Sequence, residues 1–183
     1  ESTRLPRKAL RTLSGRALVH HVYRRAAQCT LLTDLILATD SPEIEAYCRK
    51  HNLKVMMTSN EHQSGTDRIY EVATRTQADI FVNVQGDEPL LRAQDIQKVV
   101  ESHMKSGLDI GTAIRINENF EDYNNPNIVK CVYAKSGKAM YFSRSSISHQ
   151  QEFKQFNQHI GIYSYKAQAL LKFVDYPVSE LEK

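Results

Sequence analysis

Residues 82–89, which read VNVQGDEP, carry the polar side chains with the clearest chemical use in the chain. An apolar run ends here, and Gln85, Gly86, Asp87 and Glu88 follow it. Two acids at the end of a buried strand are costly unless they face a cleft or bind a partner. A carboxylate there suits Mg²⁺ held against phosphate oxygens, and the amide of Gln85 can read a polar base edge. A plain polar turn with solvated acids is the alternative.

The basic segment at residues 2–8, STRLPRK, could hold a triphosphate. Arg4 and Lys8 flank a turn stiffened by proline, with Arg7 beside them. A triphosphate needs fixed cations and backbone donors brought close to it. A solvated basic terminus fits the same residues. The sequence contains neither a Walker A motif nor a GxGxxG, so these two phosphate-binding designs are excluded.

A third candidate segment is residues 61–68, EHQSGTDR, which follows an expected strand. Ser64 offers a hydroxyl, Gly65 permits close backbone approach, and a helix begins here whose N–H groups could meet a base or a phosphate. Arg68 lies one helical turn further on, within reach of a phosphate. A capped loop with no ligand is the plainer interpretation.

Two segments late in the chain carry groups suited to an acidic sugar. Arg144, in residues 143–147 (SRSSI), could grip a carboxylate with two parallel hydrogen bonds. Residues 159–165 (HIGIYSY) alternate, so His159 and Tyr163 share one strand face and could line a sugar pocket. Ordinary strand packing is the alternative for these two side chains.

Composition narrows the class of partner. The chain has 183 residues, 41% hydrophobic and 25% charged, which is typical of one globular domain. The net charge is only +3 without a basic block, so the composition argues against nucleic acid as a partner. Three widely spaced cysteines fit reduced thiols in a cytoplasmic protein rather than a zinc site or disulfide framework. No apolar run is long enough to predict a membrane span.

The first half of the sequence must place these groups through alternating helices and strands. Hydrophobic periodicity predicts helices at 17–28, 42–51, 65–76 and 93–106, and strands at 34–39, 53–57 and 79–84. Pro42 follows a possible Ser41 cap, and Gly107 should end the last helix. Such alternation indicates an α/β fold with a mixed, mostly parallel sheet flanked by helices. Ligands of such sheets bind at the carboxyl ends of the strands.

The second half changes to residues typical of strands. We expect strands at 109–116, 128–134, 138–143 and 159–165, a tight turn at Ser136-Gly137, and a polar loop at 149–158. This half should add antiparallel or mixed strands to the sheet, and it is the candidate region for dimer contacts.

Taken together, the motifs resemble one family. Six blocks, in the family's order, are similar to those of CMP-Kdo synthetase (3-deoxy-manno-octulosonate cytidylyltransferase): STRLPRKAL, HQSGTDR, NVQGDEPL, YFSRSSI, HIGIYSY and PVSELEK. The resemblance spans essentially the whole chain. It implies a Rossmann-like nucleotide-diphospho-sugar transferase fold in a single domain, residues 1–183. It also implies a cytoplasmic homodimer that uses Mg²⁺ and supplies lipopolysaccharide or capsule synthesis.

The resemblance further implies a reaction and a role for each matching residue. The family transfers CMP from CTP to the anomeric hydroxyl of Kdo, the acidic sugar 3-deoxy-manno-octulosonate, and releases pyrophosphate. Catalysis would rest on Arg4, Lys8 and Asp87, with Asp87 as the Mg²⁺ ligand. The implied CTP site comprises Arg4, Lys8, Ser64, Gly65, Arg68, Gln85 and Gly86. The implied Kdo site comprises Arg144, His159 and Tyr163, with Arg144 on the sugar carboxylate.

The sequence departs from the family pattern at both ends. Family members begin with a strand and a Pro-Ala-Arg stretch before STRLP, and they continue beyond LEK with further Kdo and metal ligands. We therefore expect an N-terminal strand and a C-terminal segment beyond the residues printed here. As printed, the chain should be weakly active or inactive.

Three other interpretations stay open. A related cytidylyltransferase for sialic acid would usually carry Gly-Ser-Lys in the first loop and Pro-Thr-Ser-Pro in place of residues 85–89. An amino-modified Kdo, such as the 8-amino sugar, is a subtler alternative substrate. A protein that kept the fold without catalysis is an alternative from another class.

Overall fold

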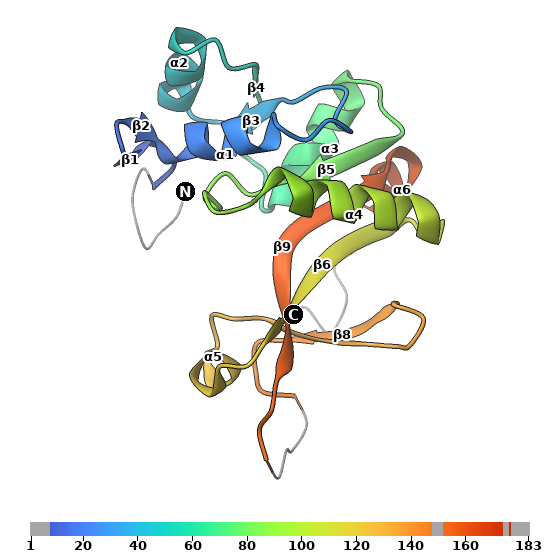
Figure 1. Ribbon diagram of the computed structural model, residues 1–183. Helices are drawn as coiled ribbons and strands as arrows, with labels where there is room; N and C mark the ends of the chain where they lie inside the picture. Colours follow the sequence, from blue (N-terminus) through green and yellow to red (C-terminus); the bar gives the residue numbers. More distant parts are fainter. Residues whose placement is uncertain (1–7, 148–151, 174–175, 177–183) are drawn as a thin grey trace. The chain divides into compact units, whose positions relative to one another are not determined.

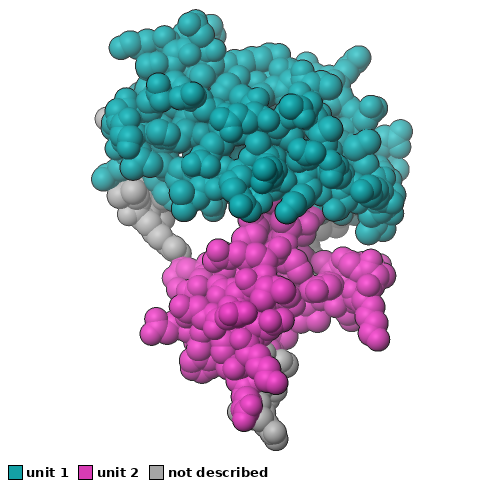
Figure 2. Space-filling view, viewed as in Figure 1, with its two compact units in different colours: residues 1–111, 163–183 teal, residues 112–162 magenta. Residues whose placement is uncertain are grey.

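Two compact units make up the fold, and each is described by itself. The computed structural model describes residues 8–147, 152–173 and 176, so Arg4 and Arg7 lie outside the described residues. Unit 1 combines residues 1–111 with 163–183, and unit 2 is the continuous segment 112–162 (Figure 2). The strands β6 (Ile110–Asn117) and β9 (Phe156–Lys166) each run along the chain from one unit into the other.

Unit 1 holds the alternating helices and strands that the sequence predicts. Its helices are η1 (Lys8–Leu10), α1 (Leu18–Ala26), α2 (Pro42–Lys50), α3 (Gly65–Arg75), α4 (Ala93–Ser106) and α6 (Ala167–Phe173). Its strands are β1 (Thr12–Leu13), β2 (Arg16–Ala17), β3 (Leu37–Thr39), β4 (Val55–Met57) and β5 (Ile80–Asn83). Each predicted helix and strand of this half is confirmed, with ends that shift by a few residues.

Local signals explain the helix ends. The side chain of Ser41 caps α2 by accepting a hydrogen bond from Ile44 N, and Pro42 occupies the first turn, where its missing N–H costs nothing. Gly107 ends α4 in the left-handed conformation, with φ of 66°. Both of these predictions are confirmed.

One segment of unit 1 differs from the prediction. The sequence predicted a helix from residue 17 and no strand before it, but a short antiparallel hairpin of β1 and β2 comes between η1 and α1. Its turn is Ser14-Gly15, and both residues have positive φ. The Ser-Gly pair is a turn signal in the sequence that the helical periodicity of the following residues hid.

The pairing of strands in unit 1 is mixed. Strands β3 and β4 are parallel, with Leu37 opposite Val55. Strand β5 pairs antiparallel with the end of β9, where Asn83 lies opposite Tyr163. Helices α3 and α4 lie on either side of β5 (Figure 1). The α/β prediction is therefore confirmed, but a mostly parallel sheet is not what the described residues form. The parallel pair β3–β4 is a two-stranded sheet of its own, and β5, β7, β8 and β9 pair antiparallel in another sheet.

Unit 2 is built from hairpins and one short helix. Strands β7 (Lys130–Tyr133) and β8 (Ala139–Ser143) pair antiparallel, and β7 pairs with β9 through Lys130 and Gln158. The predicted turn at Ser136-Gly137 is confirmed, with φ of 84° at the glycine. The predicted polar loop at 149–158 is wrong at its end, because β9 already begins at Phe156, whose buried ring packs beside Tyr123 of α5 (Phe120–Asn124).

Replacing Gly111 by Ala should destabilise unit 1 by about 1–3 kcal/mol. A Cβ at this position would lie 2.6 Å from Ser164 Oγ and 3.2 Å from the Cβ of His103, which is closer than atoms pack. Chemical unfolding measures the loss. Ser164 Oγ is buried and has no hydrogen-bond partner among the described residues, so Ser164→Ala alone should cost little and should rescue part of the Gly111→Ala loss. An unchanged unfolding midpoint in Gly111→Ala would contradict this packing argument.

Candidate functional site

In unit 1, the polar residues gather where β3, β4 and β5 end. The residue after β3 is Asp40, and the residue after β4 is Thr58. Arg68, in the first turns of α3, joins these two ends: its Nη2 lies 3.1 Å from Asp40 Oδ2, and its Nη1 donates to Thr58 Oγ1 at 2.5 Å. The guanidinium is therefore fixed at the carboxyl edge of the parallel pair, where the sequence predicted a ligand site.

Ser64 and Gly65 lie against the end of β5. A Cβ on Gly65 would be 3.3 Å from Asn83 Nδ2 and 3.3 Å from Gln85 Nε2. Ser64 caps α3 in a capping box: its hydroxyl accepts from Asp67 N, while Asp67 Oδ2 accepts from Ser64 N at 2.8 Å. Three residues that the sequence proposed for one nucleotide site, Ser64, Gly65 and Gln85, thus come together in space.

Lys8 and Asp87 form an ion pair at the same edge. Lys8 Nζ donates to Asp87 Oδ2 at 2.8 Å, and both side chains are partly exposed, at 36% and 44%. The turn that presents Asp87 is closed by Glu88 N, which donates to Gln85 O at 3.2 Å. A Cβ on Gly86 would lie 3.5 Å from Val19, so α1 backs this turn. A cation and a carboxylate proposed for one reaction are therefore neighbours although 79 residues separate them in the sequence.

The residues present fit a Mg²⁺ ion of the kind that accompanies phosphates. Asp87 is a partly exposed carboxylate that already faces a cation, the ammonium of Lys8. The described residues contain no cluster of three or more His, Cys, Asp and Glu side chains able to hold a metal by themselves. Mg²⁺ commonly binds one or two carboxylates and takes its other ligands from substrate phosphates and water. A single carboxylate beside the Lys8 ammonium, a group able to bind phosphate, is consistent with this mode of Mg²⁺ binding.

Gly65→Ala should weaken CTP binding about tenfold with little loss of stability. The added methyl group meets two amide nitrogens at 3.3 Å, so Gln85 must move away from the position it holds. Titration calorimetry with CTP measures the change. Asn60→Ala, in the exposed part of the same loop, is the control and should bind CTP normally. Equal affinity in the Gly65 variant would remove this contact from the nucleotide site.

Unit 2 fixes Arg144 by its backbone and by its side chain. Arg144 Nη1 donates to Pro126 O at 3.2 Å. The carbonyl of Arg144 accepts from Lys130 Nζ at 2.8 Å, and Lys130 is 2% exposed. The lysine also donates to Asn125 O and Ile128 O, so one buried ammonium ties three stretches of unit 2 together. Burial lowers the pKa of Lys130 below its usual range.

His159 has a defined tautomer in unit 2. The hydroxyl of Thr112 donates to Ile162 O at 2.8 Å, so it accepts from His159 Nε2, which lies 2.9 Å away. The imidazole also meets the ring of Phe142 edge-on, at 5.0 Å between centroids. Burial lowers the pKa of His159, which favours the neutral ring with its proton on Nε2.

Tyr163 lies in unit 1, opposite Asn83 at the end of β5. Its ring stacks on Tyr165 at 6.0 Å between centroids. Burial, and then the neighbouring Tyr165, raise the pKa of Tyr163. Of the three proposed sugar contacts, Arg144 and His159 therefore belong to unit 2 and Tyr163 belongs to unit 1.

Sequence reasoning missed several residues that position the site. Asp40, Thr58 and Lys130 were not predicted as site residues. The available signal for Asp40 was its position directly after a predicted strand, which is the position that Gln85 also holds. A lysine in a predicted strand gave no signal, because lysines are usually exposed.

The described part of the chain also contains no helix that is long and apolar enough to cross a membrane.

Comparison with known proteins finds the same resemblance along the whole chain. The profile of the cytidylyltransferase family matches residues 1–183. The 3-deoxy-manno-octulosonate cytidylyltransferase of Koribacter versatilis is 42% identical over 185 residues, which cover 100% of this chain and 70% of the relative. The enzyme of the same name from Elusimicrobium minutum is 42% identical over 189 residues, covering 100% of this chain and 77% of its own length.

Solved structures are similar to the fold. A CMP:2-keto-3-deoxy-manno-octonic acid synthetase in complex with CTP superposes with a TM-score of 0.93 at 34% identity, covering 100% of this chain and 76% of that one. A cytidylyltransferase from Leptospira borgpetersenii has a TM-score of 0.62 at 15% identity, with 99% and 62% of the two chains covered. The second likeness concerns the fold alone.

Proposed function

The chain belongs to the cytidylyltransferase family, and from that premise we propose that it transfers CMP from CTP to the anomeric hydroxyl of Kdo and releases pyrophosphate. One observation carries the proposal: the Lys8–Asp87 ion pair lies beside the turn of Gln85 and Gly86 at the carboxyl edge of unit 1. A carboxylate that can bind a metal ion and an ammonium that can bind a triphosphate therefore lie next to the amide of Gln85, which can hydrogen-bond to a base.

The nucleotide would be held by residues of unit 1. Gln85 and Gly86 would meet the cytosine, with Ser64 and Gly65 against them. Lys8, with Arg4 from outside the described residues, would neutralise the phosphates. Arg68, anchored by Asp40, keeps guanidinium donors that can turn to a phosphate.

Charge neutralisation and alignment supply the catalysis in this proposal. Asp87 would hold Mg²⁺, which when bound offsets charge on the α-phosphate and the leaving pyrophosphate. Lys8 would exchange its contact with Asp87 for the triphosphate when CTP binds. The sugar hydroxyl would then attack the α-phosphorus in line, and pyrophosphate would leave.

Arg144, His159 and Tyr163 are the proposed Kdo contacts. Arg144 suits the sugar carboxylate, because a guanidinium binds a carboxylate through two parallel hydrogen bonds. His159, whose Nε2–H donates to Thr112 Oγ1, would line the sugar pocket as a neutral imidazole. We also propose that the protein acts in the cytoplasm and that its product, CMP-Kdo, is used for lipopolysaccharide or capsule synthesis.

We propose that the protein works as a homodimer through the β8 side of unit 2. Within the described residues, β8 is the last strand of its sheet, and its Met140 and Tyr141 are 69% and 61% exposed. An exposed apolar edge strand is a surface that commonly pairs with another chain. Sedimentation velocity should give a dimer for the natural sequence and a monomer for Met140→Lys. A dimer in both would move the interface elsewhere.

The first experiment is pyrophosphate release with CTP and Mg²⁺ from Kdo, its 8-amino analogue and N-acetylneuraminate. Release with Kdo alone is the expected result. Release with another sugar would keep the CTP site and change the sugar assignment. No release with any of them, from the folded full-length protein, would favour a protein that kept the fold without catalysis.

A further inference from the structure

Helix α3 presents a stripe of charged residues to the chain segment that precedes it. Arg68, Glu71 and Arg75 are spaced three and four residues apart, so they lie on one face of the helix. All three contact residues 57–62: Arg68 reaches Thr58, and Arg75 Nη1 donates to Met57 O at 3.1 Å. The stripe therefore holds the loop that leads from β4 into α3.

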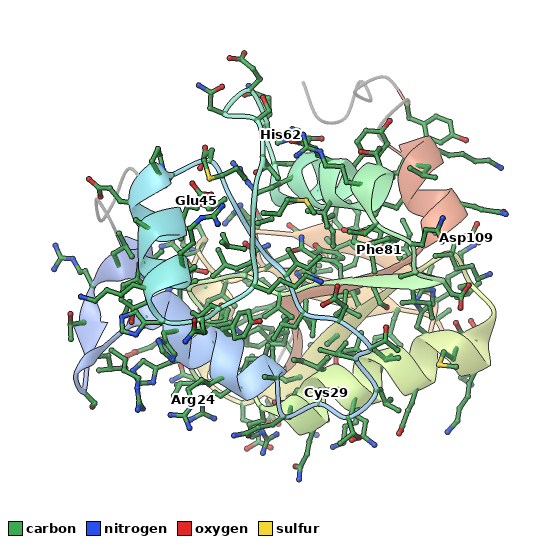
Figure 3. All side chains as sticks on the ribbon, turned by 90° about the horizontal axis from the view of Figure 1, so that it is seen from above. Arg24, Cys29, Glu45, His62, Phe81 and Asp109 are labelled. Carbon is green, nitrogen blue, oxygen red and sulfur yellow. The ribbon has the colours of Figure 1, made fainter. Side chains whose placement is uncertain are left out.

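Glu71 is the centre of this stripe. Its Oε2 accepts from Ser59 N at 2.8 Å and from His62 Nε2 at 2.5 Å, and its other oxygen pairs with Arg75. The side chain of Glu71 is 14% exposed and that of His62 is 17% exposed. Figure 3 shows His62 on the loop above α3. One carboxylate thus joins two points of the loop to the helix.

The physical state of Glu71 is well defined. The Ser59 N–H, followed by His62, lowers the pKa of the Glu71 carboxyl below its usual range. It is therefore an anion at neutral pH, and its hydrogen bonds are charge-assisted. Such bonds are stronger than those between neutral groups, so this carboxylate is a suitable anchor for a loop.

The other hydrogen bonds of the loop lie within it or are long. Glu61 N donates to Ser59 Oγ, Gln63 Nε2 donates to Glu61 O, and Arg68 Nη1 donates to Ser59 O at 3.4 Å. Ser59, Asn60, Glu61 and Gln63 are exposed, so no buried apolar side chain of theirs anchors it. Its continuation is Ser64 and then Gly65, which lies against Asn83 and Gln85. Ser64 is held to α3 by its capping box with Asp67, so the Glu71 anchor fixes the direction in which the chain approaches that cap and Gly65.

We propose that Glu71 is a positioning residue for the nucleotide: it holds the segment from Ser59 to His62, so that Ser64 and Gly65 are already placed against Gln85 before CTP binds. The inference rests on the proposed function for its choice of ligand. Without the anchor, CTP binding must order the loop, and that cost appears as lost affinity.

The test is Glu71→Gln, which keeps the shape of the side chain and removes its charge. The Kd for CTP, measured by calorimetry, should rise about tenfold, and the KM for CTP should rise with it. The kcat and the KM for Kdo should stay within about twofold, since the loop does not touch the sugar in this proposal. A purely structural role would lower stability and leave the ratio of the two KM values unchanged.

Glu45→Gln is the matched control. Glu45 pairs with Arg49 four residues further along α2, as Glu71 pairs with Arg75, but its hydrogen bonds go to Arg49 and Ser41 and not to the loop. CTP affinity should not change in this variant. A rise equal to that of Glu71→Gln would show a general effect of lost helix charge and would overturn the inference.

His62→Asn provides a second variant on the loop itself, which does not depend on the folding of Glu71→Gln. It should raise the Kd for CTP about threefold, and the double variant should be no worse than Glu71→Gln alone, because both act through one contact. Normal CTP affinity in both single variants overturns the inference. A different outcome separates the two proposals. If the variants bind CTP more weakly but the natural protein turns over none of the three sugars, the proposed function is overturned and the role of Glu71 as loop anchor is kept.

Discussion

Replacing Asp87 by Asn is expected to slow CMP transfer at least about 100-fold while the protein stays folded. The amide has no charge, so it neither attracts Mg²⁺ nor pairs with Lys8, whose Nζ lies 2.8 Å from the carboxylate in this structure. A 100-fold loss equals about 2.7 kcal/mol of transition-state stabilisation, which is a typical cost for removing one electrostatic group from a site of this kind. Pyrophosphate release at saturating CTP, Kdo and Mg²⁺ is the measurement.

The adjacent acid supplies the control for this experiment. Glu88 neighbours Asp87, and its backbone N–H closes the turn onto Gln85 O, so Glu88→Gln removes a charge without touching the ion pair. Turnover by Glu88→Gln should stay within about threefold of normal. Near-normal turnover by Asp87→Asn would reject the metal assignment, and an unfolded Asp87→Asn would be recognised by circular dichroism.

Replacing Lys130 by Met is expected to destabilise the protein by about 3 kcal/mol or more. Methionine fills a similar volume but has no donor, so the carbonyls of Ile128 and Arg144 lose the ammonium that bonds them, while Asn125 O loses it but keeps the bond from Ile128 N. A buried carbonyl left without its partner costs about 1–3 kcal/mol. Urea unfolding followed by circular dichroism measures the change.

The Lys130→Met variant should weaken Kdo binding more than CTP binding. The Lys130 bond fixes the backbone of Arg144, so the KM for Kdo should rise more than the KM for CTP. Lys166→Met is the control: Lys166 Nζ also donates to a carbonyl, that of Gly107, but its side chain is 42% exposed. Its loss should cost less than about 1 kcal/mol. Equal destabilisation by the two variants would contradict the role given to burial.

The elements of unit 1 could be predicted because their signals are local. Ser41 and Pro42 start one helix, and Gly107 ends another, through contacts within a few residues of each other. The capping box of Ser64 and Asp67 has the same character. The hairpin around Ser14-Gly15 is also local, but the helical spacing of the residues that follow it dominated the prediction.

The extent of β9 could not be predicted from its own residues. The segment at 156–158 is polar apart from Phe156, and polarity indicated a loop. It is a strand because Phe156 packs beside Tyr123 and Lys130 pairs with Gln158, and both contacts come from residues more than 25 positions away. Strand pairing of this kind depends on partners that the local pattern does not contain.

The chemical groups of this protein and their order along the chain can be read without coordinates: Lys8, the Gln85-Gly86-Asp87 turn, Arg144 and His159. The family can be read in the same way, since six blocks of residue types occur in one order. Which groups meet depends on the tertiary structure. Strand ends bring Lys8 to Asp87 and Arg68 to Asp40 across long stretches of chain, and the face of α3 places Glu71 beside His62. Such pairings depend on long-range packing, and the free energy of a charge depends on the burial and partners that this packing creates.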